Sequence, residues 1–277
     1  MSVAFELPID NVTEQVKIHL RAVSRQYLAG GESFYALEGI NLEVSAGEFL
    51  CIVGPSGCGK STLLHLIAGM DRPSGGSISL DGEPVVGPGP DRLLILQELG
   101  LFPWLTAREN VEFGLKLKSY SKSDRRELAR RYLNLVHLSQ FENSYPHQLS
   151  GGMKQRVALA RALVMKPDVL LMDEPFAALD AQTRDRLHDE LERIWDETGQ
   201  TIIFVTHNVR EAVRLGDRVV VMGYRPGRIK REFRIALERP RHLENVVVAR
   251  AARQIHNCLR EEIEKSTRAE YQDELGD

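Results

Sequence analysis

The chain has 277 residues, with 36 Lys and Arg against 39 Asp and Glu and a formal net charge of −3. This near balance gives no basic field of the kind that collects nucleic acid, so we expect no nucleic-acid partner. No apolar run approaches the roughly 18 residues needed to cross a bilayer, and the N-terminus lacks the order of a signal peptide, which predicts a soluble, cytosolic protein.

The N-terminal part of the chain predicts short strands. Apolar and polar residues alternate in the first of them, which indicates a half-buried strand, and the second is apolar throughout, which indicates a buried one. The expected strands span residues 16–20, 49–53, 77–80 and 92–96. We expect antiparallel β elements on this side of the fold.

Residues 54–62 read GPSGCGKST and fit G-x-x-x-x-G-K-[ST], the phosphate-binding loop. A glycine-rich turn after a buried strand points its backbone N–H groups inward, and a helix beginning near Lys60 adds the positive end of its dipole. A triphosphate is the expected occupant, with Lys60 at the β and γ phosphates and the Ser61 hydroxyl on Mg²⁺. The expected nucleotide contacts are Gly54, Pro55, Ser56, Gly57, Cys58, Gly59, Lys60, Ser61 and Thr62. The alternative is a plain glycine-rich turn.

Cys58 lies inside this loop and allows two interpretations. A thiol near a helix N-terminus can have a lowered pKa, and an adduct there would fill space meant for phosphate. Alternatively, Cys58 is a small buried residue without reactivity.

The middle of the chain changes to helical spacing. We expect helices over residues 106–118 and 123–138, the second with Ser123 as its N-cap. After an interruption at Pro146, another helix runs to about residue 165. These segments predict a helical insertion at about residues 98–160.

In the C-terminal half, strands and helices alternate. Strands are expected over residues 169–172, 201–205 and 218–222, and helices over 181–198 and 208–215. Alternation of this kind predicts an α/β fold with a mostly parallel sheet covered on both faces, here as a phosphate-loop NTPase core.

The strand that begins at residue 169 ends in two carboxylates, Asp173 and Glu174. A buried parallel strand presents such residues at its C-terminal edge, beside the nucleotide. Asp173 is then placed to hold Mg²⁺ through water, and Glu174 is the candidate general base. The alternative is that both acids cap the turn at Pro175.

Together these segments resemble the nucleotide-binding subunit of an ATP-binding cassette (ABC) transporter. The resemblance covers roughly residues 16–231. The discriminating segment is LSGGMKQR at residues 149–156, because many phosphate-loop ATPases lack it. The other matching pieces are GPSGCGKST, Gln97, LLMDEP at residues 170–175, ALD at 178–180, and His207. The resemblance implies an ATPase that uses ATP and Mg²⁺.

It also implies that two copies, or one copy and a homologous subunit, close head to tail. Each ATP would lie between the phosphate loop of one subunit and Ser150, Gly151 and Gly152 of the other. A serine hydroxyl and glycine N–H groups at a helix N-terminus suit a γ-phosphate, which would explain why residues 151 and 152 lack side chains.

The resemblance gives roles to further residues. His207 matches the switch histidine at the γ-phosphate, Gln97 the glutamine that contacts Mg²⁺ and the water, and Asp180 the acid that organises the opposite site. The implied catalytic set is Glu174, His207, Gln97 and Lys60, and the implied metal ligands are Ser61, Gln97 and Asp173. Tyr27 is expected to stack on adenine, with Phe34 and Tyr35 as alternatives. Leu96 departs from the family's frequent phenylalanine.

We expect an ABC ATPase domain over residues 16–235 and a C-terminal helical extension over 236–277. Beyond Pro240, apolar residues recur at helical spacing at Val248, Ala252, Ile255, Leu259 and Ile263. This helix either packs on its own domain or makes a dimer or regulatory contact.

Residues 101–111, LFPWLTARENV, most resemble subunits of bacterial importers for nitrate, taurine and alkanesulfonates, and GPGPDR at 87–92 fits the same group. The implied function is the ATPase of such an importer, on the cytoplasmic side of the inner membrane, with permease subunits and a substrate-binding protein. The alternatives are an ABC system for another substrate, including export, and a soluble ABC ATPase outside transport. Residues 101–105 either form the groove that receives a coupling helix of the permease or belong to the core of the insertion.

Overall fold

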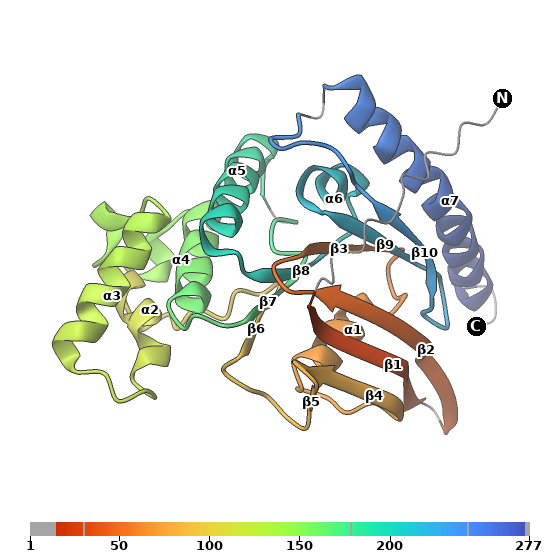
Figure 1. Cartoon of the computed structure of the whole chain (residues 1–277), viewed down its shortest axis with the longest axis horizontal. Coiled ribbons are helices and arrows are strands. Elements are labelled where there is room, and N and C mark those ends of the chain that lie inside the picture. The colour runs from red at the N-terminus through yellow and green to blue at the C-terminus, as the bar shows by residue number, and fades with distance from the viewer. Residues whose placement is uncertain (1–14, 30, 178, 243, 275–277) are drawn as a thin grey trace.

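The computed structural model describes residues 15–29, 31–177, 179–242 and 244–274. Its centre is a sheet in the order β10-β9-β3-β8-β7-β6 (Figure 1). Its strands are β3 (Phe49–Val53), β6 (Arg92–Ile95), β7 (Val169–Asp173), β8 (Thr201–Thr206), β9 (Arg218–Met222) and β10 (Ile229–Arg234). All neighbours pair in parallel except β10, which is antiparallel to β9. The mostly parallel sheet expected from the sequence is confirmed.

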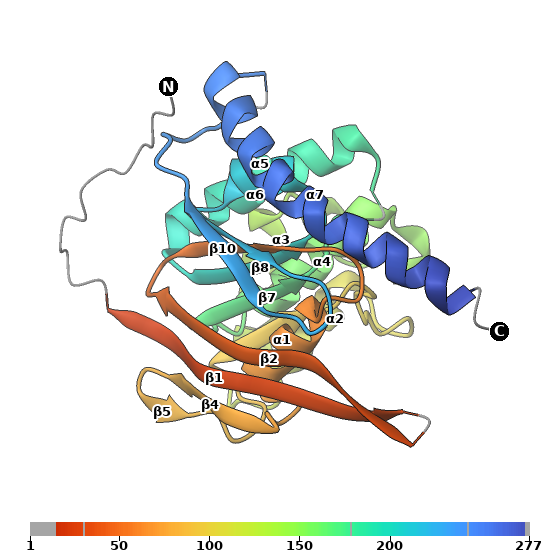
Figure 2. The same ribbon diagram turned by 90° about the vertical axis from the view of Figure 1, so that its right-hand side faces the viewer.

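Every residue of β3, β7 and β8 is buried, because layers cover both faces of this sheet. On one face, helix α1 (Lys60–Ile67) lies between the central sheet and a second sheet (Figures 1 and 2). There, Leu63 and Leu64 join Ile52 and Leu20 in one apolar cluster. The phosphate loop therefore sits between a buried strand and a buried helix.

The second sheet is antiparallel, in the order β2-β1-β4-β5. Its strands are β1 (Val16–Ala29), β2 (Glu32–Ser45), β4 (Gly75–Leu80) and β5 (Glu83–Pro84). The sequence indicated β1 and β4 but only part of β1, and it did not indicate β2. Ile40, Leu42 and Val44 do alternate with exposed neighbours, but the first half of β2 is exposed and carries no such pattern.

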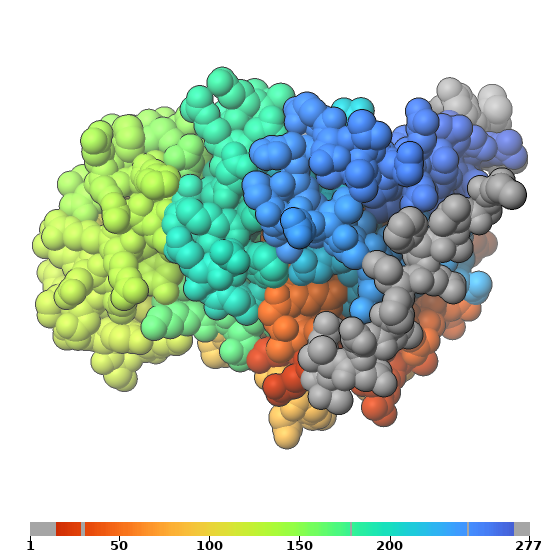
Figure 3. All heavy atoms as spheres, turned by 45° about the horizontal axis from the view of Figure 1, so that its top comes forward, coloured from red at the N-terminus to blue at the C-terminus, as the bar shows by residue number. Residues whose placement is uncertain are grey.

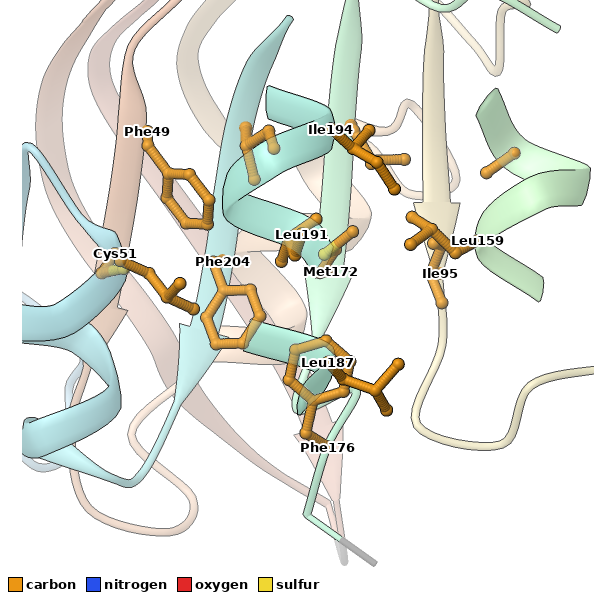
Figure 4. Close-up of a cluster of buried hydrophobic side chains, with 14 of the residues drawn as sticks. Phe49, Cys51, Ile95, Leu159, Met172, Phe176, Leu187, Leu191, Ile194 and Phe204 are labelled. Atoms are coloured by element: carbon orange, nitrogen blue, oxygen red, sulfur yellow. The ribbon is translucent and has the colours of Figure 1, made fainter. Parts of the chain in front are cut away.

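On the other face of the central sheet lie α5 (Ala181–Thr198) and α6 (Val209–Leu215). Leu187, Leu191 and Ile194 of α5 pack over Phe204 and Phe49, as Figure 4 shows. The two phenylalanine rings lie 6.0 Å apart between their centroids. This layer fixes the ends of β7 and β8, which carry Asp173, Glu174 and His207.

The helical insertion gathers α2 (Ala107–Leu115), α3 (Lys122–Leu135) and α4 (Gly151–Leu163) at one end of the molecule (Figure 1). Two short 3₁₀ turns, Ser139–Phe141 and Pro146–Gln148, join α3 to α4. The expected N-cap at Ser123 is wrong. Ser121 caps α3, because its side chain accepts a hydrogen bond from the Asp124 N–H.

Helix α7 (Val246–Glu274) packs against α6 and strand β9 and covers part of the face seen in Figure 3. Val248, Ala252, Ile255 and Leu259 are buried against the domain, whereas Ile263 is 41% exposed. The helix thus packs on its own domain, as one of the two interpretations held. The expected domain boundaries stay a prediction.

Some expectations concern residues outside those described: the signal-free N-terminus (residues 1–14), Ala178 of the 178–180 segment, and residues 275–277. Among the described helices, none combines the length and apolar character that a membrane span requires.

Candidate nucleotide-binding site

The loop between β3 and α1 has a backbone that needs glycine. Gly57 and Gly59 have φ angles of 71° and 94°, in the left-handed region. A Cβ atom on Gly59 would also lie 2.7 Å from Leu37 Cδ2 and 2.8 Å from the Ala36 carbonyl oxygen. Both the turn and the close approach of β2 exclude a larger residue at position 59.

Lys60 is held inside this loop. Its side chain is only 6% exposed, and Nζ donates hydrogen bonds to the carbonyl oxygens of Gly54 and Pro55, each at 2.9 Å. These carbonyls compensate the buried ammonium group. A bound phosphate would be a stronger acceptor than either carbonyl.

The loop opens onto a cavity of about 520 Å³, which is within the range of small-molecule sites. Its walls bring together distant parts of the chain: Tyr27, Phe34, Ala36, Ser56, Gly57, Gly59, Lys60, Ser61, Thr62, Gln97, Asp173, Glu174 and Arg225. Gln97 and Asp173 meet here because β6 and β7 are parallel neighbours, so their C-terminal ends reach the same edge.

The three residues expected to hold Mg²⁺, Ser61, Gln97 and Asp173, all line this cavity. A hydroxyl, an amide and a carboxylate offer the oxygen ligands that Mg²⁺ takes, usually together with phosphate oxygens. Within the described part of the chain, no cluster of three or more His, Cys, Asp and Glu could hold a metal ion. The donor set therefore fits a Mg²⁺ bound jointly with a nucleotide, rather than one in a cage of protein carboxylates.

Glu174 lines the cavity, and His207, which does not line it, pairs with Glu174 beside it. His207 Nδ1 lies 2.8 Å from Glu174 Oε2. Glu174 has φ at +45°, which is costly for a residue other than glycine, and its N–H donates to the Val205 carbonyl at 3.0 Å. The His207 side chain is 63% exposed, which leaves the pair open to water.

A buried polar network behind this pair was not predicted from the sequence. His188 of α5 is 3% exposed, and its Nε2 lies 2.5 Å from Glu211 Oε1 of α6. The other carboxylate oxygen of Glu211 accepts from the Thr206 hydroxyl. The network ties α5, α6 and the end of β8 together directly beside His207. The sequence did hold one signal for this network: His188 lies among the apolar positions of α5, where a polar side chain needs a buried partner.

Of the three aromatic candidates for the adenine, Tyr27 and Phe34 line the cavity and Tyr35 does not. Tyr27 and Phe34 are cross-strand partners, with ring centroids 6.0 Å apart. The Arg25 guanidinium lies 4.6 Å from the Tyr27 ring centroid, and the Tyr27 hydroxyl donates to Asp71 at 3.0 Å. These contacts fix the ring.

Ser150, Gly151 and Gly152 do not line this cavity. Ser150 caps α4 by accepting from the Met153 N–H at 3.3 Å. A Cβ atom on Gly152 would lie 2.5 Å from Thr183 Cγ2, so packing within the chain already requires this glycine. The explanation by phosphate alone is therefore incomplete for Gly152. At Gly151 a Cβ would meet only Leu179, at 3.5 Å.

Asp180 likewise has a role inside the chain. It caps α5, accepting from the Thr183 N–H at 2.9 Å, and this hydrogen bond holds the pKa of Asp180 below its usual range. Its expected part in the opposite site stays a prediction.

Cys58 has the environment of an unreactive thiol. It is fully buried, and burial raises the pKa of the thiol even though the Lys60 ammonium acts to lower it. Of the two interpretations of Cys58, burial therefore favours the unreactive one. The helix begins beside it, but desolvation of the thiolate dominates.

Residues 101–105 were expected either to form a groove for the permease or to belong to the core of the insertion, and they differ in burial. Phe102 is half-buried, with its ring centroid 4.4 Å from that of Phe113, and Leu101 packs against the core of the insertion. Trp104, by contrast, is 69% exposed.

Comparison with known proteins shows which family this chain is similar to. The model of the ABC transporter family matches residues 37–177. The chain is 51% identical over 220 residues to the nitrate import ATP-binding protein of Synechocystis sp., which covers 79% of this chain and 83% of that one. It is 49% identical over 205 residues to the taurine import ATP-binding protein of Pelagibacter ubique, covering 74% and 77%.

A solved structure adds a view of assembly. A dimeric ATP-binding cassette in a post-hydrolysis state, bound to ADP and Pi, has a TM-score of 0.72 and 36% identity to this chain. The match covers 80% of this chain and 100% of that one.

Proposed function

We propose that this chain, which belongs to the ABC transporter family and is the ATPase subunit of an importer, uses ATP hydrolysis to drive uptake of a small anion or sulfonate such as nitrate, taurine or an alkanesulfonate. The names of the two relatives support this substrate class. We further propose that permease subunits hold the chain at the cytoplasmic face of the membrane, with a substrate-binding protein on the other side.

The observation that carries the mechanism is the composition of the cavity. It holds the phosphate loop, the metal-ligand candidates and Glu174, but it lacks Ser150 and Gly151 of the same chain. One chain thus supplies half a site, and a second copy arranged head to tail would supply the other half. The dimeric state of the solved relative supports this arrangement.

Three sets of contacts bind ATP in this half site. Tyr27 stacks on the adenine. The loop N–H groups hold the phosphates, and Lys60 exchanges the carbonyl oxygens of Gly54 and Pro55 for phosphate oxygens. Ser61, Gln97 and Asp173 would hold Mg²⁺, whose charge neutralises the phosphates as the terminal bond breaks.

Hydrolysis then depends on Glu174 and His207. Glu174 accepts a proton from the attacking water, and His207, at 2.8 Å from that carboxylate, orients the water toward the γ-phosphate. Closure by Ser150 and Gly151 of the second copy excludes bulk water and adds N–H donors at the γ-phosphate. Release of Pi after hydrolysis removes the group that joins the two copies, so the dimer opens and the permease can reset.

The test is transport in proteoliposomes that contain the chain, its permease subunits and its substrate-binding protein. We expect uptake of at least one of nitrate, taurine and an alkanesulfonate with ATP inside, and none when the chain carries Glu174→Gln. ATP-driven uptake of a solute that is neither an anion nor a sulfonate, with none of these three compounds transported, would contradict the proposed substrate class.

A further inference from the structure

One cation in the wall of the nucleotide cavity belongs to no sequence motif. Arg225 lies in the loop between β9 and β10, far along the chain from the phosphate loop, yet it lines the same cavity as Lys60. A Cβ atom on Gly57 would lie 3.7 Å from Arg225 Nη2 and 3.9 Å from Nε. The guanidinium therefore stands directly against the middle of the phosphate loop.

The loop that carries Arg225 contacts both strand β2 and the phosphate loop. Gly227 donates from its N–H to the Ala36 carbonyl and accepts from the Glu38 N–H, each at 3.0 Å. A Cβ atom on Gly227 would lie 2.2 Å from the Cys58 carbonyl oxygen, so only glycine lets this loop touch the phosphate loop. These contacts place Arg225 next to the expected phosphates.

Helix α7 holds the same loop from the other side. The buried Glu262 accepts from the Tyr224 N–H at 2.9 Å and forms ion pairs with Lys230 at 2.8 Å and Lys265 at 2.7 Å. Burial acts to raise the pKa of Glu262, but these hydrogen bonds outweigh it and bring that pKa to about 2. Glu262 is therefore an anion across the neutral pH range. Its hydrogen-bond partner Tyr224 directly precedes Arg225 in the chain.

The two arginines of this loop have different surroundings. Arg228 forms an ion pair with Glu38 at 2.6 Å. Arg225 forms no ion pair among the described residues. Its guanidinium lies 5.6 Å from the ring centroid of its neighbour Tyr224. An unpaired guanidinium in a cavity that receives a polyanion is suited to bind phosphate oxygens through two parallel N–H groups.

We propose that Arg225 is a second phosphate-binding cation of the nucleotide site, and that Glu262 of α7 is the positioning residue that aims it. The proposal rests on the proposed use of this cavity for ATP. Because Arg225 stands at Gly57, before Lys60 and Ser61 in the loop, it contacts phosphates that ATP and ADP share. The C-terminal helix thereby sets the affinity of the site for both nucleotides.

The test uses the isolated full chain and measures the Kd for MgATP and ADP by calorimetry. Arg225→Ala is expected to raise both Kd values roughly tenfold, because a charge-assisted hydrogen bond is lost. Arg225→Lys should recover part of the affinity. Arg228→Ala is the matched control, since it removes a cation of the same loop outside the cavity, and it should change neither Kd more than about twofold.

Glu262→Gln tests the positioning role. It should raise both Kd values in the wild-type background but add nothing to Arg225→Ala, because residues that act through one contact are not additive. An additive loss would show that Glu262 acts on the site through general stability and would overturn that half of the proposal.

Two other outcomes separate the proposals. Tight MgATP binding by the wild type with unchanged Kd values in Arg225→Ala would overturn the role of Arg225 and leave the proposed function intact, as would equal losses in Arg225→Ala and Arg228→Ala. Failure of the wild type to bind either nucleotide would overturn both proposals.

Discussion

Glu174 has two properties that suit a general base. Its backbone is held in the left-handed region, with φ at +45°, between a buried strand and a turn. Its carboxylate is paired with His207 and is only partly exposed, at 22% of the side chain. Strain of this kind persists where surrounding structure imposes it, here through the hydrogen bond to Val205.

We predict that Glu174→Gln abolishes turnover while it preserves binding. The amide keeps the shape and tolerates the same backbone, but it does not accept a proton, so ATP hydrolysis should fall by about 10² to 10⁴. Phosphate release and the Kd for MgATP measure the two effects. Glu127→Gln, on the exposed face of α3, removes the same charge as a control. Near-normal turnover in Glu174→Gln would remove Glu174 from this role.

At the scale of elements, the loop before α2 is built to present a side chain. Asn110 is fully buried, accepts from the Phe102 N–H at 2.8 Å, and donates to the carbonyls of Phe102, Leu105 and Thr106. A capping box of Thr106 and Glu109 starts the helix. The loop is therefore rigid, and Trp104 stands out from it.

We predict that Trp104→Glu disrupts assembly with the permease and leaves the isolated chain intact. A side chain that is 69% exposed supports little of the fold, whereas a charge on an apolar docking surface opposes burial there. Co-purification with the permease and MgATP affinity are the measurements. Val86→Glu, at a site 77% exposed on the antiparallel side, is the matched control. A retained complex with normal transport in Trp104→Glu would refute docking at this loop.

The buried strands and helices were predicted well from the sequence, whereas the exposed strands β2 and β10 were missed. Continuous apolar runs marked β3 and β9, and the amphipathic spacing of α5 gave both of its ends. The edge strand β10 reads IKREFR, and such charged residues carry no burial signal, so it was missed. The N-cap of α3 was predicted at Ser123 instead of Ser121, because residue type alone does not show which serine accepts the capping hydrogen bond.

The candidate site shows the same limit. Asp173 could be predicted because a buried parallel strand presents its last residues at one edge of the sheet. Gln97 was predicted from the resemblance to ABC subunits, and the pairing of β6 with β7 brings it to the same edge. Arg225 could not be predicted, because its position depends on how the β9–β10 loop meets β2 and the phosphate loop. The buried His188–Glu211 pair also joins residues whose contact depends on tertiary packing alone.

At the scale of the molecule, the proposed site is divided between two separate parts of the chain. The phosphate loop lines the cavity, whereas Ser150 and Gly151 lie at the start of α4, outside it. In a head-to-tail dimer each ATP would use one half from each copy. A variant defective in only one half should therefore complement a variant defective in the other.

We predict that a heterodimer of Lys60→Ala and Gly151→Asp chains, both with Glu174→Gln, traps a single ATP. One site combines both defects, and the other combines the two intact halves. Gly151→Asp suits this test because a Cβ there meets only Leu179 at 3.5 Å, and an acid in the first turn of α4 favours the helix while it repels phosphate. Gly152 would be a poor choice, since a side chain there collides with Thr183. Two affinity tags isolate the heterodimer, and bound nucleotide is counted after gel filtration. Each homodimer should trap none. A heterodimer that traps no ATP would mean that each chain completes its own site. ATP retained by the Gly151→Asp homodimer would mean that residue 151 is no part of the site. Either result would contradict the head-to-tail arrangement.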